Sequence, residues 1–121
     1  MAQVLGIGGF FFRSEDPAAL ADWYETHLGI PPAPTSTSMQ PWISEQGVTI
    51  FSPFPKDSNY FAEDRGFMLN FRVADLDVTI KELNAAGVES GDEVEMEGIG
   101  RFARIHDPEG NPIELWEPIQ S

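Results

Sequence analysis

Cysteine is absent from the sequence, and histidine is scarce. Without cysteine the chain has no disulfide bonds, no thiolate metal sites and no cysteine nucleophile. Its two histidines are His27, within a predicted helix, and His106, beside a predicted turn. A metal site would therefore have few imidazole ligands to draw on.

Basic residues are also few. Seven Lys and Arg stand against 20 Asp and Glu, which gives a formal net charge of −13. A field of this sign repels phosphate backbones, so no nucleic-acid partner is expected. The charge suits cationic ligands, although the solubility of an acidic cytosolic protein explains it more simply.

Long apolar runs are missing as well. No stretch approaches the ~18 consecutive apolar residues of a membrane-spanning helix. The N-terminus has neither the basic region nor the apolar stretch of a secretory signal. We therefore expect a cytoplasmic protein with no membrane association.

Large apolar side chains, in contrast, are plentiful. The 121 residues include nine Phe, three Trp and two Tyr, and 41% of the chain is hydrophobic. This supply argues against disorder despite the charge. The length favours one domain with a real core, so residues 1–121 are expected to fold together.

The first half predicts a strand, a helix and two further strands. The apolar run of residues 4–13 is typical of a buried strand. Asp16, followed by a proline, begins a helix as its N-cap. The apolar stripe of this helix consists, at helical spacing, of Leu20, Trp23, Tyr24 and Leu28, and Gly29 ends the helix. Residues 39–44 and 48–54 are expected to pair as a short hairpin.

The second half predicts the same order of elements. In residues 67–73 apolar side chains alternate with Met68, Asn70 and Arg72, as in a strand with two different faces. Asp75 caps a second helix, and Gly87 ends it. A further strand is expected at residues 93–96, within an acidic stretch.

The last hairpin carries the most distinctive stretch, residues 107–118, which reads DPEGNPIELWEP. Asp-Pro and Gly-Asn are turn dipeptides, and they separate two predicted strands, residues 101–105 and 113–117. Glu114 lies inside the second of these strands. A carboxylate on a sheet face is either a solvated surface residue or the functional acid of a cavity.

The two halves look like an internal repeat. Residues 12–16 (Phe-Arg-Ser-Glu-Asp) and 71–75 (Phe-Arg-Val-Ala-Asp) both end a strand and cap a helix. We therefore predict two βαβββ modules, residues 1–55 and 66–121, joined by a linker at 56–65. One such module cannot bury its own sheet face, so the modules should pair. The predicted fold is α+β, with curled mixed sheets forming a U-shaped trough and the helices outside.

These features resemble the vicinal oxygen chelate superfamily of glyoxalases, bleomycin resistance proteins and extradiol dioxygenases. The resemblance is carried by residues 13–29, 71–87 and 107–117, and it covers nearly the whole chain. It implies the glyoxalase/bleomycin-resistance/dioxygenase fold. It does not by itself fix an activity, because one fold supports many functions.

Enzymes of that superfamily hold a divalent metal on the trough floor, with open positions for substrate. The resemblance places the three ligand positions at Gly9, Met68 and Glu114. Glycine has no side chain and a thioether is too soft for an oxygen-preferring metal, so only Glu114 remains. His106 and Asn70 are the nearest substitutes. We expect no metal site and no cofactor, with a loosely held divalent metal as the alternative.

The resemblance also sets which side chains face the trough. They are aromatic and apolar with a few polar groups, as a small-molecule pocket requires. Glu114 is the candidate catalytic residue, or else a carboxylate held in an ion pair by Arg104 or Arg72. Tyr60 and Phe61, in an otherwise polar linker, are candidates to cover a site or a partner. The predicted ligand-binding residues are Phe11, Arg13, Trp42, Asn70, Arg72, Phe102, Arg104 and Trp116.

Three functional hypotheses follow. The first, favoured by Gly9, Met68, the aromatic content and the charge, is a metal-free small-molecule binding protein. It would be similar to the antibiotic-sequestering branch of the superfamily, whose members are homodimers. The second is a lyase, isomerase or dioxygenase that uses a nonstandard metal set around Glu114, or Glu114 as general base. The third is a regulatory domain without a ligand.

Overall fold

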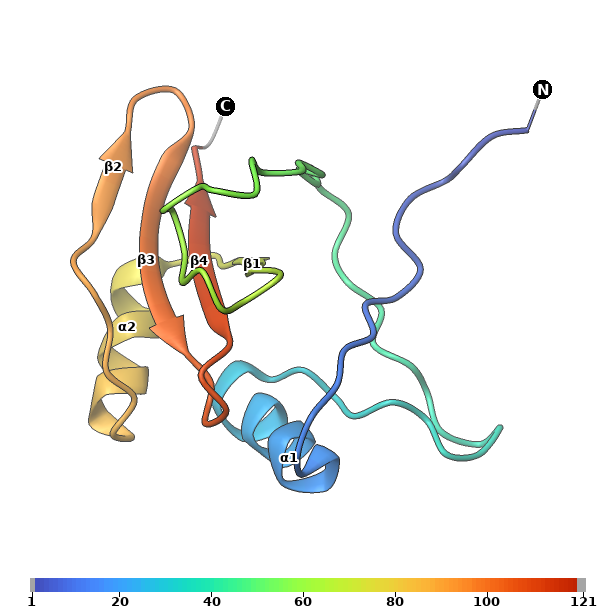
Figure 1. Ribbon diagram of the computed structural model, residues 1–121. Helices are drawn as coiled ribbons and strands as arrows, with labels where there is room; N and C mark the ends of the chain where they lie inside the picture. Colours follow the sequence, from blue (N-terminus) through green and yellow to red (C-terminus); the bar gives the residue numbers. More distant parts are fainter. Residues whose placement is uncertain (1, 120–121) are drawn as a thin grey trace.

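The structure, a computed structural model, describes residues 2–119. Within these residues it is an α+β fold with two helices and one four-stranded mixed sheet (Figure 1). The strand order is β1-β4-β3-β2, with β1 parallel to β4 and the other pairs antiparallel. The α+β prediction is confirmed. In chain order the elements are α1 (Pro17–Leu28), β1 (Leu69–Arg72), α2 (Leu76–Ala85), β2 (Val94–Met96), β3 (Gly100–His106) and β4 (Pro112–Pro118).

Both helices begin where the sequence predicts. The side chains of Asp16 and Asp75 each accept a hydrogen bond from the backbone N–H three residues later, at 3.2 and 3.1 Å. Gly29 closes α1 with a left-handed φ of 69°, and Gly87, with a φ of 88°, follows the end of α2. Neither described helix is long and apolar enough to cross a membrane.

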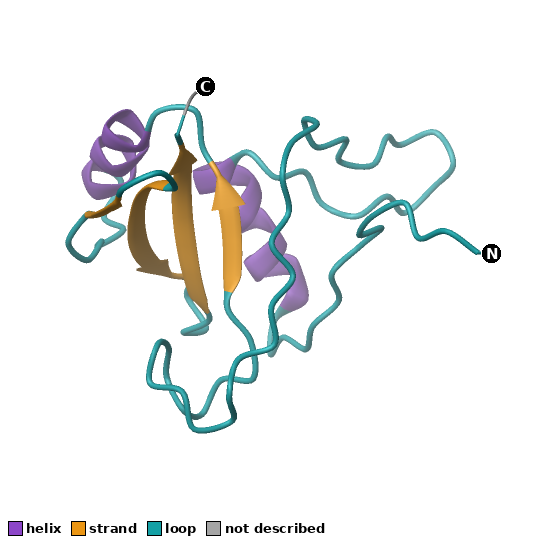
Figure 2. Cartoon of the chain, turned by 90° about the horizontal axis from the view of Figure 1, so that it is seen from above, coloured by secondary structure: helices purple, strands orange, loops and turns teal. Residues whose placement is uncertain are grey.

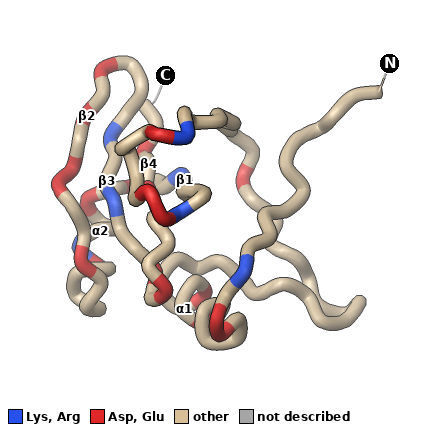
Figure 3. The backbone as a smooth tube through the Cα atoms, viewed as in Figure 1, with Lys and Arg blue, Asp and Glu red and all other residues tan. Residues whose placement is uncertain are grey.

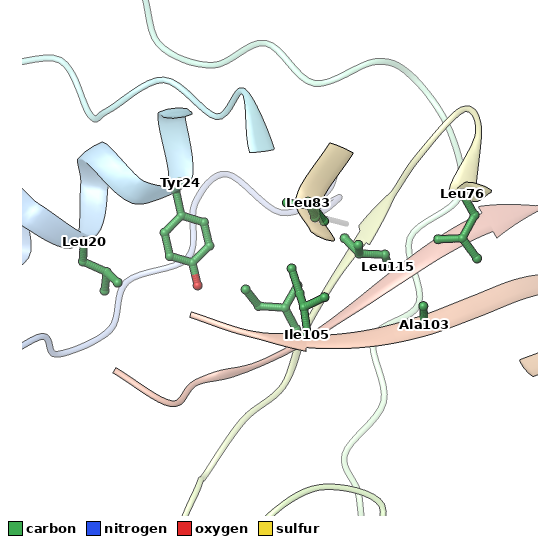
Figure 4. Close-up of a cluster of buried hydrophobic side chains, with 8 residues drawn as sticks. Leu20, Tyr24, Leu76, Leu83, Ala103, Ile105 and Leu115 are labelled. Carbon is green, nitrogen blue, oxygen red and sulfur yellow. The ribbon is translucent and has the colours of Figure 1, made fainter. Parts of the chain in front are cut away.

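The hydrophobic core lies between the helices and one face of the sheet. Figure 2 shows both helices on the same side of the strands. Because strand side chains alternate, every second residue of β3 and β4 points toward them. The side chains that meet there are Leu20 and Tyr24 of α1, Leu76 and Leu83 of α2, Ala103 and Ile105 of β3, and Ile113 and Leu115 of β4 (Figure 4).

The turn between β3 and β4 holds α1 in place. The hydroxyl of Tyr24 donates to the buried Asp107 carboxylate at 2.7 Å. Asp107 also accepts from the backbone and side-chain amides of Asn111, at 3.0 and 2.8 Å. Glu109 accepts from the Ser14 hydroxyl at 2.7 Å and from two backbone N–H groups at the start of α1. The Asp-Pro-Glu-Gly-Asn sequence thus joins the helix to the hairpin.

The strands predicted in the first half are not formed. Residues 4–13, 39–44 and 48–54 run as extended or irregular chain, well to the side of the sheet in Figure 1. Most of their apolar side chains are exposed, as Leu5 at 92% and Phe51 at 84% show, while Phe12 is partly buried against the core. A strand needs a neighbour to pair its backbone groups, and the described sheet takes all its strands from the second half. The described chain therefore has one sheet in place of the two-sheet trough.

Candidate ligand-binding site

Glu114 lies on the sheet face opposite the core. In the strand register it is paired with Asn70 on β1 and with Arg104 on β3. One step along the same face, Trp116 is paired with Arg72 and Phe102. The structure thus brings together six predicted site residues, namely Asn70, Arg72, Phe102, Arg104, Glu114 and Trp116.

The Glu114 side chain is held by neutral donors. The residue is only 7% exposed. Its Oε1 accepts from Asn70 Nδ2 at 2.8 Å, and its Oε2 accepts from the Tyr60 hydroxyl. Among the ion pairs of residues 2–119, none includes Glu114. The predicted brace by Arg104 or Arg72 is therefore wrong.

Both arginines bind elsewhere, which explains that result. Arg72 Nη2 donates to the backbone carbonyl of Glu45 at 2.8 Å. Arg104 Nη2 donates to the carbonyl of Tyr60 at 3.1 Å, and its Cζ lies 5.1 Å from the centre of the Tyr60 ring. That distance is within the range of a cation–π contact. Tyr60 thus forms hydrogen bonds with both Arg104 and Glu114, which are paired across neighbouring strands.

Tyr60 belongs to the segment of residues 56–65, which passes over this face of the sheet (Figure 1). Burial, together with the hydrogen bond to Glu114, raises the pKa of the Tyr60 hydroxyl. The hydroxyl therefore stays protonated and acts as the donor. The Phe54 ring lies 5.6 Å from the Tyr60 ring and 5.7 Å from the Phe61 ring, centre to centre. The sequence names Tyr60 and Phe61 as linker aromatics that could cover a site. In the structure Tyr60 lies over Glu114 and Arg104.

A stacked aromatic pair lies beside the polar group. The rings of Phe102 and Trp116 are stacked, with centres 5.8 Å apart and planes 6° from parallel. The Trp116 indole N–H donates to the carbonyl of Ile99 at 3.1 Å, so the indole has its polar partner. Flat apolar rings next to a few fixed polar groups are the usual lining of small-molecule sites.

Arg104 keeps one donor free. Its Nε is buried and has no hydrogen-bond partner within residues 2–119. An unpaired buried donor costs about 1–3 kcal/mol. An acceptor atom brought by a ligand would remove that cost.

The charge of this face differs from that of the whole chain. Figure 3 shows acidic residues on α1, β2 and several loops, with basic residues on β1 and β3. Arg72 and Arg104, two of only seven Lys and Arg in the chain, lie on the Glu114 face. The predicted preference for cationic ligands, drawn from the net charge, has no support from the side chains of this face.

The comparison with protein families covers most of the sequence. The family model of the glyoxalase-like domain matches residues 9–116. The chain belongs to this family. Among proteins of curated function, none matches the sequence.

Solved structures agree with this family fold. This glyoxalase-like chain is similar to TnmS3, an antibiotic binding protein from Streptomyces sp. CB03234. The TM-score is 0.64 and the identity 19%, over 98% of this chain and 100% of that one. It is also similar to a member of the glyoxalase/bleomycin resistance protein/dioxygenase superfamily from Sphaerobacter thermophilus DSM 20745. There the TM-score is 0.54 and the identity 21%, over 86% of this chain and 90% of that one.

A third structure matches over a shorter length. It is a glyoxalase family protein from Enterococcus faecalis, with a TM-score of 0.42 and 28% identity over 53% of this chain. The glyoxalase-like chain spans 52% of the length of that protein, about half.

The side chains at the expected metal positions do not fit a divalent ion. Of the three positions, Gly9 supplies no donor atom and Met68 supplies only a thioether. The remaining one, Glu114, has an amide and a phenol as neighbours. His106 is paired with Pro112, one step from the Arg104–Glu114 pair on the same sheet face, and its side chain is exposed. Within residues 2–119, no three His, Cys, Asp or Glu side chains are grouped as metal ligands.

The site residues predicted from the first half lie apart from Glu114. Phe11 is 94% exposed, and Arg13 is exposed as well. The Trp42 ring packs against Phe71, with ring centres 6.3 Å apart. Phe71 is paired with the core residue Leu115, so Trp42 approaches the other face of the sheet. These three residues were placed by the two-sheet trough, which the described chain does not form.

Sequence reasoning missed the contact between Tyr24 and Asp107. The helix stripe correctly gave Tyr24 an inward position, and the turn sequence gave Asp107 a turn position. Burial and the hydrogen bond to Asp107 raise the pKa of Tyr24 well above its ordinary value. A buried tyrosine needs a partner for its hydroxyl, and that requirement was the signal in the sequence.

Proposed function

We propose that this chain binds a small molecule, without a resident metal, on the Glu114 face of its sheet. The observation that carries the proposal is a buried carboxylate held by neutral hydrogen-bond donors beside a stacked aromatic pair. Burying a carboxylate without a cation is costly, and such groups are concentrated at functional sites. The similarity to TnmS3, an antibiotic binding protein, supports an antibiotic as the ligand.

The alternative is a divalent-metal-dependent lyase, isomerase or dioxygenase built around Glu114. The donor atoms near Glu114 argue against it, because an amide and a phenol are weak ligands for a divalent ion. A general-base role for Glu114 would need a substrate proton within hydrogen-bond reach. In the structure the Tyr60 hydroxyl takes that position.

We further propose that the protein acts as a homodimer. The first half exposes many large apolar side chains, among them Val4, Leu5, Phe11, Ile43 and Phe51. Exposed apolar surface of this extent marks an interaction site in soluble proteins. A second copy of the chain is the partner that the superfamily resemblance implies.

The binding proposal is tested with a panel of bulky antibiotics, using thermal shift first and calorimetry for the hits. We expect at least one compound to raise the melting temperature of the wild-type protein. Glu114→Ala should weaken the binding of that compound by roughly tenfold or more, because the substitution removes a charged hydrogen-bond acceptor. Glu97→Gln is the matched control, since Glu97 is an exposed turn residue.

Two results would contradict the proposal. One is a binding constant that is the same for Glu114→Ala and the wild type, which would move the site elsewhere. The other is stoichiometric Fe, Mn, Ni or Zn in protein purified without a metal-affinity column, lost in Glu114→Ala. That second result would favour the metal-dependent alternative.

A further inference from the structure

Tyr60 occupies the proposed site as a ligand would. Its hydroxyl donates to Glu114, and its ring lies beside the Arg104 guanidinium at 5.1 Å. It reaches the site from a loop rather than from a strand of the sheet, and 47% of the residue remains exposed. The sheet face therefore recognises a phenol within its own chain.

The two contacts together define one kind of chemistry. A cation beside the ring favours an electron-rich aromatic group. The buried Glu114 oxygen, already bonded to Asn70 on its other side, requires a hydrogen-bond donor at the ring edge. An ionised phenolate would place a negative charge against Glu114, so only the neutral hydroxyl is compatible with the site.

The loop is suited to giving up this position. Tyr60 is fixed by its hydroxyl, by the carbonyl contact with Arg104 and by the Phe54 ring, which is itself 43% exposed. No strand pairing within residues 2–119 includes this segment. Segments with few buried contacts open at low free energy. When Tyr60 leaves, Glu114 loses a donor and Arg104 loses an aromatic partner.

We propose that the ligand of this site is a neutral hydroxyaryl compound that displaces Tyr60 and donates its hydroxyl to Glu114. This inference rests on the proposed function and narrows it to one ligand class. Tyr60 then competes with the ligand for the site. The apparent affinity for the ligand is the intrinsic affinity multiplied by the fraction of time that the site is open. The Nε of Arg104 is buried and has no partner within residues 2–119, so an acceptor atom that the ligand brings to it would satisfy this donor.

The test compares 2-naphthol with 2-methoxynaphthalene at neutral pH, by calorimetry and by saturation-transfer NMR. The two probes share a ring system, and only the first can donate a hydrogen bond. We expect 2-naphthol to bind roughly tenfold more tightly, the worth of one hydrogen bond to a charged group. Glu114→Gln should reduce this preference, since a neutral amide oxygen is a weaker acceptor.

Displacement is tested with two variants of Tyr60. Tyr60→Ala should bind 2-naphthol roughly tenfold more tightly than the wild type, because the competitor is gone. Tyr60→Phe keeps the ring but lacks the hydroxyl, and should fall between the two. It also keeps the inference testable if Tyr60→Ala fails to fold.

Each contrary outcome has its own meaning. Equal affinity for the two probes overturns the hydroxyaryl class and leaves small-molecule binding intact. Unchanged affinity in both Tyr60 variants overturns displacement. If the antibiotic panel gives a ligand while 2-naphthol does not bind, this inference fails alone. If neither the panel nor 2-naphthol binds any variant, the proposed function fails with it.

Discussion

Two tyrosines donate to carboxylates in this molecule, and their burial separates their roles. Tyr24 is 7% exposed and bonds to Asp107 inside the joint between α1 and the last hairpin. Tyr60 is 47% exposed and bonds to Glu114 on the open face of the sheet. A buried hydrogen bond is costly to lose because water cannot replace it, whereas an accessible one can be exchanged.

Tyr24→Phe should therefore destabilise the protein clearly. We expect a loss of about 1.5–3 kcal/mol in the free energy of unfolding, because Asp107 is left buried with one donor fewer. Urea denaturation followed by circular dichroism measures this loss. Tyr60→Phe is the comparison and should cost less than Tyr24→Phe, because the Tyr60–Glu114 hydrogen bond is only partly buried. Equal losses in the two variants would mean that burial does not separate these tyrosines.

Glu109 makes part of the stability depend on pH. Hydrogen bonds from the Ser14 hydroxyl and from the Glu15 backbone N–H lower the pKa of Glu109 below its ordinary 4.5. A lowered pKa means that the ionised form stabilises the fold. This stabilisation is fully present above pH 4.5 and is lost as the pH falls through the folded-state pKa.

Melting temperatures of the wild type and Glu109→Gln, measured against pH, test this. The wild type should melt higher at neutral pH, and the two curves should converge in acid. Glu97→Gln, which alters an exposed carboxylate, should parallel the wild type throughout. A Glu109→Gln deficit of constant size at all pH values would show that the Glu109 charge is not what stabilises the joint.

At the scale of elements, the second half was predictable because its signals are local. Asp75 marks the start of α2, and alternation marks β1 and β4. The five-residue turn at residues 107–111 fixes the β3–β4 register and places Arg104 opposite Glu114. The partners of Glu114 were not predictable in the same way. Tyr60 reaches it from a loop without regular structure, and no periodicity in the sequence encodes such a contact.

The core between β4 and the helices should be sensitive to truncation. Leu115 is fully buried, and Leu115→Ala removes apolar volume from the centre of the cluster. We expect a loss of about 2–5 kcal/mol in the free energy of unfolding. Val78→Ala is the control, because Val78 is 50% exposed on α2 and lies outside the apolar first half, and it should stay within about 0.5 kcal/mol of the wild type. A small loss for Leu115→Ala would place the core elsewhere.

For the whole molecule, the sequence predicted two paired modules and the structure has one sheet with an extended first half. The apolar pattern of residues 4–13 and 48–54 matches strands, but a pattern cannot name the neighbour that a strand pairs with. β1 is at the edge of the sheet and has one side open to a further strand. The ring contacts of Phe10 and Phe12 with Phe67, at 5.2 and 5.6 Å, bring the first segment near the start of β1.

The oligomeric state tests whether that exposed half is covered in solution. Light scattering coupled to size exclusion should give the mass of two chains, because the apolar first half would otherwise remain in water. Dilution should release monomer together with a rise in binding of a hydrophobic dye. A single-chain mass at every concentration, with no dye binding, would show that each chain covers its own first half.

Trp116 gives this molecule an optical property that follows from its position. Its indole is buried, stacked on Phe102 and bonded to Ile99, so its emission should be blue-shifted relative to that of the half-exposed Trp42. It also lies one pairing step from Glu114 on the same face. A molecule seated beside Glu114 that absorbs at the indole emission wavelength will quench the short-wavelength part of the spectrum first. The protein therefore carries its own reporter of occupancy, and no label needs to be attached.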